Sequence, residues 1–139
     1  MNKFTDYDSE GAVNEYYEIN MDECCKAKCS EAIDNAGMCI TIAGAQEAAG
    51  DYEGAIENYD RALAYAYTSR ITFLSYLGRG RVKSILRDLS GAVEDLNNAL
   101  YYDFRSTEAY LLRSFVNSQL GRKKESIEDL AKAYELIEE

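Results

Sequence analysis

Histidine, proline and tryptophan are all absent from this chain of 139 residues. The missing histidine removes the commonest general base, the commonest metal ligand and every Ser-His or Cys-His nucleophile pair. The short signatures of phosphate-binding loops, dinucleotide-binding turns and zinc-protease helices are missing as well. These absences predict a protein that is not an enzyme and that carries no cofactor.

An apolar leader and a long apolar run are also lacking. Acidic residues follow Met1-Asn2-Lys3, where a secretory signal would carry its hydrophobic segment. The longest apolar run, around residues 38–45, is interrupted by Thr41 and Gly44 and is far shorter than a membrane span. We therefore expect a soluble, cytoplasmic protein that does not bind membranes and whose cysteines are reduced.

Basic residues are scarce in the first part of the chain. Residues 1–60 contain 14 acidic and 3 basic residues, whereas residues 61–139 contain 11 acidic and 12 basic residues, so the total charge is −10. This balance argues against nucleic-acid binding, because neutralising phosphates requires a basic surface. It predicts an acidic N-terminal segment followed by a nearly neutral body.

The four cysteines, Cys24, Cys25, Cys29 and Cys39, lie within sixteen residues of one another. Thiolates bind zinc and copper, so metal binding or redox sensing is one interpretation. The ligand spacing of structural zinc sites is missing, however, and free cysteine commonly behaves as a small buried apolar residue. We therefore predict no metal site and keep metal or redox sensing as the least favoured alternative.

A repeat runs along the chain, and its composition favours helices throughout. Segments 51–63, 88–100 and 122–134 align without gaps at offsets of 37 and 34 residues. In each segment the apolar residues are spaced by three and four, which places them on one face of a helix. The three apolar sets are Ile56, Tyr59 and Leu63; Val93, Leu96 and Leu100; and Ile127, Leu130 and Tyr134.

A second helical pattern precedes each of these segments. Its marker is a small residue twelve positions before the first small residue of the segment: Ala43, Gly80 and Ser114. Gly50 and Gly121 mark the turn between paired helices, whereas the middle repeat has no glycine there. The pattern predicts a helix–turn–helix unit of about 34 residues, repeated over about 36–69, 70–105 and 106–139. Further small residues lie beside the apolar sets: Ala55, Ala62, Ala92, Ala99, Ser126 and Ala133.

These small residues, together with Tyr52, Tyr59, Tyr76 and Tyr110, resemble the pattern of the tetratricopeptide repeat family. The resemblance covers residues 36–139 and implies an all-α fold, a right-handed α-solenoid of stacked helix pairs. Residues 1–35 form a separate acidic helical segment in this interpretation. Within them, residues 10–16 echo residues 53–59, which suggests a degenerate half repeat.

In this family the first helices of successive repeats line a concave groove that holds a protein partner. Some members clamp acidic chaperone tails with Lys and Asn, but the matching positions here carry Ile40, Gly44, Gly78, Glu108 and Leu112, so we predict no such clamp. A mostly apolar groove favours an amphipathic helix or an extended apolar peptide, and Gly44 and Gly78 are expected to leave room for its backbone. The expected groove residues are Ile40, Thr41, Gly44, Leu74, Leu77, Gly78, Arg81, Leu111, Leu112, Phe115 and Gln119.

Five basic residues lie on the central helices. Arg79, Arg81, Lys83, Arg87 and Arg113 make the central helices basic; we favour a face that is solvated or paired within the chain over docking of an acidic segment.

No polar capping helix follows the last repeat in this sequence, so the outer face of the last pair is expected to be exposed, which predicts self-association or a partner there. The expected residues are Tyr110, Val116, Ile127 and Tyr134. The favoured function is a protein–protein interaction scaffold, and the alternative is a homo-oligomer that assembles through the uncapped C-terminal repeat.

Overall fold

The computed structural model describes the backbone of residues 23–139 and the side chains of residues 35–139. The described backbone contains helices and turns without a strand. Residues 35–139 form one compact unit. The proposed half repeat and the side chains of Cys24, Cys25 and Cys29 lie outside the described residues. The helices are α2 (Glu23–Ala49), α3 (Tyr52–Ala64), α4 (Ser69–Ile85), α5 (Leu89–Tyr102), α6 (Thr107–Gln119) and α7 (Lys123–Glu138).

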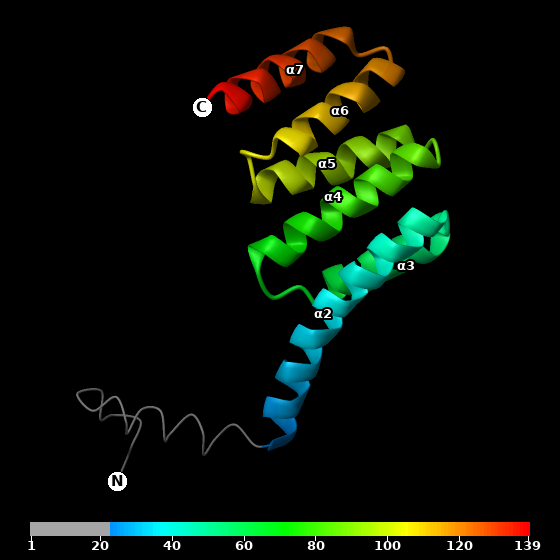
Figure 1. The fold of residues 1–139 in the computed structure, drawn as a ribbon, viewed down its shortest axis with the longest axis vertical. Coiled ribbons are helices and arrows are strands. Elements are labelled where there is room, and N and C mark those ends of the chain that lie inside the picture. The colour runs from blue at the N-terminus through cyan, green and yellow to red at the C-terminus, as the bar shows by residue number, and fades with distance from the viewer. Residues whose placement is uncertain (1–22) are drawn as a thin grey trace, which may run out of the picture. The chain divides into compact units, whose positions relative to one another are not determined.

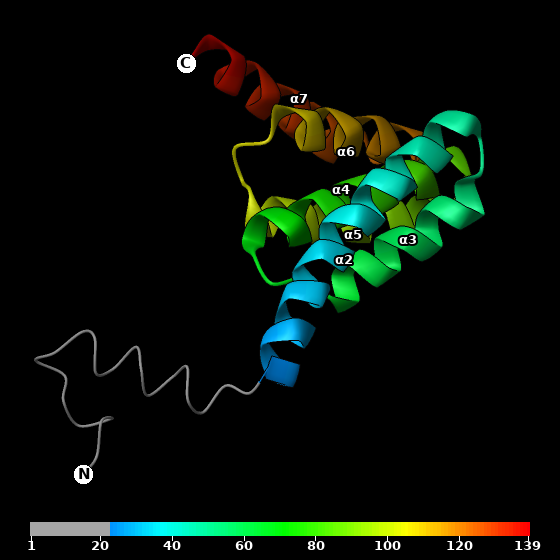
Figure 2. The same cartoon turned by 60° about the horizontal axis from the view of Figure 1, so that its bottom comes forward.

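Within residues 35–139 the helices follow one another as pairs, α2 with α3, α4 with α5, and α6 with α7 (Figures 1 and 2). Each helix packs chiefly against its neighbours in the sequence, which is the contact pattern of a repeat protein. The prediction of an all-α solenoid of helix–turn–helix repeats is confirmed. None of the described helices combines the length and the apolar character needed to cross a membrane.

Four of these helices have a short polar residue as their N-cap. Asp51, Thr68, Asp88 and Ser106 each accept a hydrogen bond from the backbone N–H three residues later, at 3.1–3.2 Å. Such N-caps satisfy donors that the first helical turn leaves unpaired. Helix α7 begins after Arg122, whose side chain makes no capping hydrogen bond.

The turns inside the three pairs share one backbone conformation. Gly50 and Gly121 have φ angles of 84° and 77°, in the left-handed region that glycine occupies without strain. The middle pair places Arg87 there with a φ of 70°. The turn that lacks a glycine signal in the sequence therefore has the same geometry as the other two.

The recurring small residues allow close contact between paired helices. Ala43, Gly80 and Ser114 are all buried. A Cβ added at Gly80 would lie 3.2 Å from Cγ of Leu96, which is tighter than ordinary packing. The Ser114 hydroxyl donates a 2.8 Å hydrogen bond to the carbonyl of Ser126 across α6 and α7. These contacts explain why the repeat requires small side chains at these positions.

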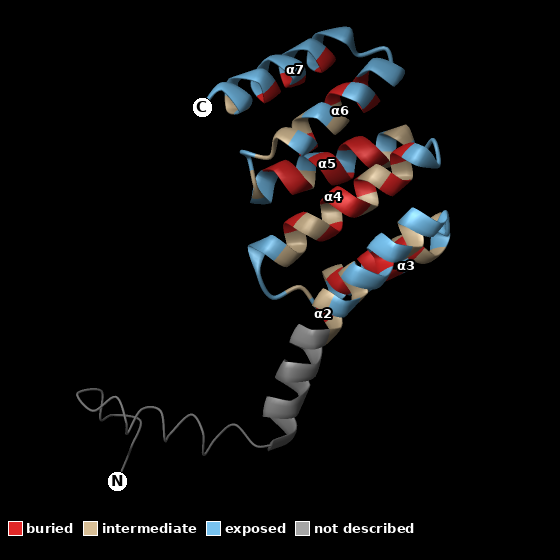
Figure 3. Cartoon of the chain, in the orientation of Figure 1, coloured by how far each residue is buried: buried red, intermediate tan, exposed pale blue. Residues whose placement is uncertain are grey.

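The largest apolar cluster joins α4, α5 and α6, where Figure 3 colours much of the ribbon as buried. A smaller cluster, centred on Tyr59 and Val82, joins the first pair to α4. Val116 was expected on the exposed outer face, but it is completely buried in the larger cluster because it lies on the face of α6 that packs against α5. Tyr110 is half-buried, whereas Ile127 and Tyr134 are exposed as expected.

Candidate functional site

A pocket of about 470 Å³ opens on the surface between α4 and α6. Helix α6 supplies most of its lining, because Leu111, Leu112 and Phe115 fall on one face at spacings of one, three and four residues. Arg81 from α4 and Glu108 from the first turn of α6 complete the lining. The α4–α6 pocket thus has an apolar floor and a charged rim.

Arg81 joins the first helices of all three repeats. Its Nε and one terminal nitrogen donate to Glu47 of α2 at 2.5 and 3.1 Å, and its other terminal nitrogen donates to Glu108 of α6 at 2.9 Å. Tyr59 adds a 3.1 Å hydrogen bond from its hydroxyl to Glu47. Two carboxylates therefore surround one guanidinium, so this part of the surface carries a net negative charge.

The burial of these groups changes their protonation behaviour. The hydrogen bond to Glu47 raises the pKa of the Arg81 guanidinium, with burial acting in the opposite direction. Burial raises the pKa of the Tyr59 hydroxyl, and the neighbouring Glu47 carboxylate raises it further. At neutral pH Arg81 is a fixed cation and Tyr59 a neutral hydrogen-bond donor.

Four of the expected groove residues line the α4–α6 pocket. Arg81 and Leu112 are half-buried, whereas Leu111 and Phe115 are exposed. Phe115 is 52% exposed and Leu111 is 43% exposed. These four residues form the part of the predicted set that the structure brings together around one opening.

The structure places Leu77 and Gly78 in the interior. Leu77 is only 5% exposed and belongs to the larger apolar cluster, which half-buried Leu74 joins. A Cβ at Gly78 would lie 2.2 Å from Cζ of Tyr59, so the Tyr59 ring fills the space expected to admit a partner's backbone. Gly78 differs from expectation because Tyr59 of α3 covers it, and Leu77 differs because it packs into the cluster shared by α4, α5 and α6.

The remaining expected residues lie apart from the pocket lining. Thr41 and Gly44 are exposed on α2, Ile40 is half-buried there, and Gly44 has open space where a Cβ would be. Gln119 is exposed at the end of α6, where its side-chain carbonyl accepts two 3.3 Å hydrogen bonds from Arg87.

The sequence did not predict the two carboxylates that bind Arg81. Glu108 entered the sequence analysis only as a replacement for a clamp residue, and Glu47 did not enter it. Their positions could have indicated the ion pairs, because both lie on first helices of repeats, one before and one after the helix that carries Arg81.

The other basic residues of the central helices are also paired within the chain, as favoured from the sequence. Arg79 donates to both carboxylate oxygens of Asp95, at 2.7 and 2.9 Å, and lies 5.6 Å from the centre of the Tyr76 ring. Lys83 lies 3.1 Å from the same carboxylate.

The next repeat duplicates this arrangement. Arg113 donates to both oxygens of Asp129 at 2.6 and 2.9 Å and lies 5.7 Å from the centre of the Tyr110 ring. Each arginine also reaches back to the preceding repeat, Arg79 to Asp60 at 2.7 Å and Arg113 to Asn97 at 2.8 Å. These pairs are structural cross-links rather than a surface for an acidic ligand.

The cysteine cluster contributes one described side chain. Cys39 is a half-buried free thiol, and no group of three or more potential metal ligands occurs among the described side chains.

Residues 107–139, the third pair, match the family model for the tetratricopeptide repeat. Human DnaJ homolog subfamily C member 7 is 34% identical over 87 residues, which is 62% of this chain and 18% of that protein, and the mouse protein matches equally. The chain therefore spans less than a fifth of the length of these curated relatives.

Solved structures share the fold at lower identity. A tetratricopeptide-like protein from Chlorobium tepidum superposes with a TM-score of 0.71 and 23% identity, covering 81% of this chain and 84% of that one. The second tetratricopeptide domain of Spaghetti (RPAP3), bound to an HSP90 peptide, gives 0.72 and 21% identity, covering 82% and 96%. These similarities concern the fold.

Proposed function

Since the chain is a tetratricopeptide repeat protein, by its match at residues 107–139 and by its fold, we propose that it is an interaction scaffold whose α4–α6 pocket binds a partner protein. The ligand is an amphipathic helix or an extended apolar peptide. The observation that carries this proposal is the exposed apolar floor, in which Phe115 is the most exposed side chain. Large apolar side chains that stay exposed beside a polar rim are typical of binding surfaces.

The charges of the rim define the ligand further. Arg81 is already held by Glu47 and Glu108, and Glu108 remains largely exposed. A ligand that presents apolar anchors next to a basic residue complements this rim, whereas an acidic tail does not. The proposal therefore differs from the HSP90 peptide binding named for the Spaghetti domain.

Panning a library of displayed peptides against the intact chain tests the proposal. We expect enrichment of peptides that carry large apolar residues at spacings of three or four, or in alternation, with a basic residue nearby. Phe115→Glu should abolish this enrichment, because it introduces a charge into the apolar floor. Tyr67→Glu is the matched control, since Tyr67 is similarly exposed but lies in the loop between α3 and α4.

Circular dichroism should first show that both variants are folded. The acidic peptide SRMEEVD, taken from the Spaghetti complex, serves as a negative probe in a direct binding measurement. Equal enrichment by the Phe115→Glu variant, or selective binding of the acidic peptide, would contradict the proposed ligand.

The cytoplasmic location expected from the sequence stays a prediction, which imaging of a tagged chain in cells would test.

A further inference from the structure

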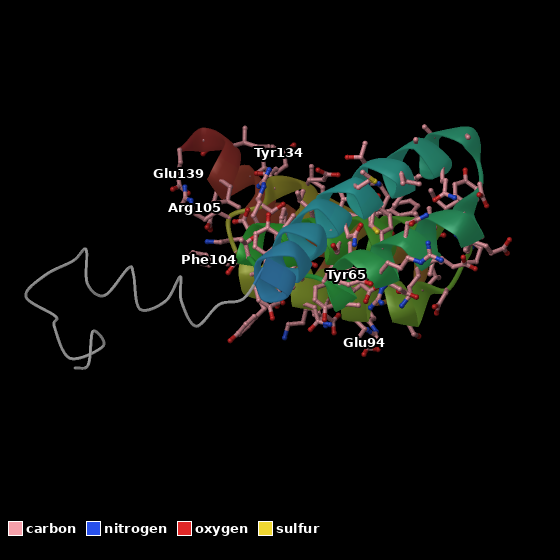
Figure 4. All side chains as sticks on the ribbon, turned by 90° about the horizontal axis from the view of Figure 1, so that it is seen from below. Tyr65, Glu94, Phe104, Arg105, Tyr134 and Glu139 are labelled. Atoms are coloured by element: carbon pink, nitrogen blue, oxygen red, sulfur yellow. The ribbon has the colours of Figure 1, made fainter. Side chains whose placement is uncertain are left out.

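Helix α7 carries an apolar stripe that nothing in residues 35–139 covers. Ile127, Tyr134 and Ile137 are 66%, 66% and 63% exposed, and Leu130 between them is also exposed (Figure 4 labels Tyr134). Spacings of three and four place all four on one face of the helix. This face is independent of the α4–α6 pocket, whose lining contains no residue of α7.

The same stripe is buried in the preceding repeat. Val93, Leu96 and Leu100 of α5 are at most 9% exposed, because they lie in the apolar cluster that joins α5 to α4 and α6. They occupy the positions that Ile127, Leu130 and Tyr134 occupy in α7. The α7 stripe therefore has the composition of a surface that a neighbouring helix covers.

Most of the terminal charges of α7 oppose its own helix dipole. The first turn carries Lys123 and Lys124 beside the single acid Glu125, and the last turn carries Glu138 and no basic residue, whereas the dipole favours acids at the start and bases at the end. No ion pair found among residues 35–139 includes the two lysines or Glu138; Glu139, by contrast, accepts from Arg105 at 2.7 Å (Figure 4). Stability of the isolated helix does not explain this order of charges.

An antiparallel copy of the same helix accounts for both features. We propose that a second copy of this chain docks on the α7 stripe, with the two α7 helices antiparallel about a two-fold axis midway between Leu130 and Tyr134. Ile127 then lies opposite Ile137 of the partner subunit and Leu130 opposite Tyr134 of the partner subunit, and Lys123 lies near Glu138 of the partner subunit. Each pairing occurs twice, as a two-fold interface requires.

The charge order selects the orientation. In an antiparallel pair the basic start of each helix meets the acidic end of the other, whereas a parallel pair brings like charges together. The helix of 16 residues is about 24 Å long, so the stripe and its charged ends fit within one continuous helix–helix contact.

Light scattering after size exclusion tests the contact with the full chain. We expect a dimer at concentrations on the order of 100 µM, which dissociates on dilution. Tyr134→Glu should weaken dimerisation at least about a hundredfold, because it places two charges at a desolvated contact. Tyr67→Glu, a similar change at an exposed tyrosine of the α3–α4 loop, should leave the dimer unchanged.

Charge reversal tests the orientation. Lys123→Glu and Glu138→Lys should each weaken the homodimer roughly tenfold, since each creates two repulsive contacts. An equimolar mixture of the two variants should restore the wild-type dissociation constant, because every contact in the mixed dimer is again attractive. Circular dichroism should show that each charge-reversal variant is folded before the two are mixed.

A wild-type chain that stays monomeric at these concentrations would overturn the proposal, and the α7 stripe would then be a candidate binding surface for a different protein. A dimer that Tyr134→Glu leaves intact would place the interface elsewhere and would overturn it as well. Failure of the mixed variants to recover would exclude the antiparallel arrangement.

Discussion

At the scale of single residues, Arg87 adopts a conformation that its side chain disfavours. Its φ of 70° matches those of Gly50 and Gly121 in the other two pairs. We expect Arg87→Gly to raise the free energy of unfolding by about 0.5–1 kcal/mol, because relief of backbone strain exceeds the added entropy of the unfolded chain. Urea unfolding would measure the change.

The control for this prediction is Arg87→Ala. It removes the hydrogen bonds to Gln119 but keeps a Cβ at the left-handed position. If Arg87→Gly were no more stable than Arg87→Ala, backbone strain at this turn would be insignificant.

Tyr59 should make folding stability depend on alkaline pH. Burial and Glu47 raise the pKa of its hydroxyl in the folded state above the ordinary value of 10.0. The neutral form is thus favoured by folding, so its contribution is fully present below about pH 10 and is lost as the pH rises through the folded-state pKa. We expect the decline in unfolding free energy above pH 10 to be shallower in Tyr59→Phe.

Urea unfolding at pH 8 and near pH 11 would measure this slope. At pH 8 the phenylalanine variant should lose about 1 kcal/mol, because the hydrogen bond to Glu47 is gone. Tyr101→Phe is the control, since the Tyr101 ring is 80% exposed at the end of α5. Equal slopes in both variants would show that Tyr59 does not titrate abnormally.

At the scale of elements, α4 and α5 are joined by a buried ion pair. Asp95 is fully buried against Arg79, with Lys83 as a second cation. Removing one partner leaves a charge without compensation, so Asp95→Ala should cost about 3–5 kcal/mol of unfolding free energy. The double variant Arg79→Met, Asp95→Leu should cost much less, about 1–2 kcal/mol, because the one charge left there, on Lys83, is partly exposed to solvent.

Thermal and urea unfolding of the single and double variants would give the coupling between the two side chains. Additive losses would mean that the carboxylate and the guanidinium act independently. The first repeat supplies a natural comparison, since Ile42 and Asn58 occupy the matching positions and no ion pair forms between them.

The helices were largely predictable from the sequence, because the recurring small residues and the turn glycines agree with how the helices pack. Small residues such as Gly80 and Ser114 recur at the repeat period, and glycine marks two of the three turns. The middle turn carried no such signal, although Arg87 adopts the same left-handed conformation there. The Arg79–Asp95 pair was not foreseen, because charges sixteen residues apart show no helical spacing.

The candidate site was only partly predictable, for a geometric reason. Sequence spacing placed Leu111, Leu112 and Phe115 on one face of α6, and the structure groups them. The same spacing included Leu77, although α4 lies between other helices on more sides and buries it. Periodicity gives the face of a helix, but not how many neighbours cover it.

At the scale of the whole molecule, stability should vary along residues 35–139. The largest apolar cluster joins α4, α5 and α6, whereas α7 has its stripe exposed. Because repeats contact only their neighbours, terminal elements open at lower free energy than central ones. We expect amide hydrogen exchange of residues 123–138 to be faster than that of residues 89–102.

Mass spectrometry of proteolytic fragments, at concentrations below any self-association, would compare the two segments. The exchange of residues 89–102 should approach the rate set by global unfolding. Uniform protection of both segments would indicate that residues 35–139 unfold as a single cooperative unit.

The bridge from Arg81 to Glu47 and Glu108 has a consequence for ligand selection. The two carboxylates are tethered to the same folded chain, so they compete for the guanidinium at a local concentration of about millimolar or higher. Any anion in free solution must displace this built-in competitor before it reaches Arg81. Under the proposed function, this competition disfavours acidic ligands by mass action, while apolar ligands meet the exposed floor beside the bridge.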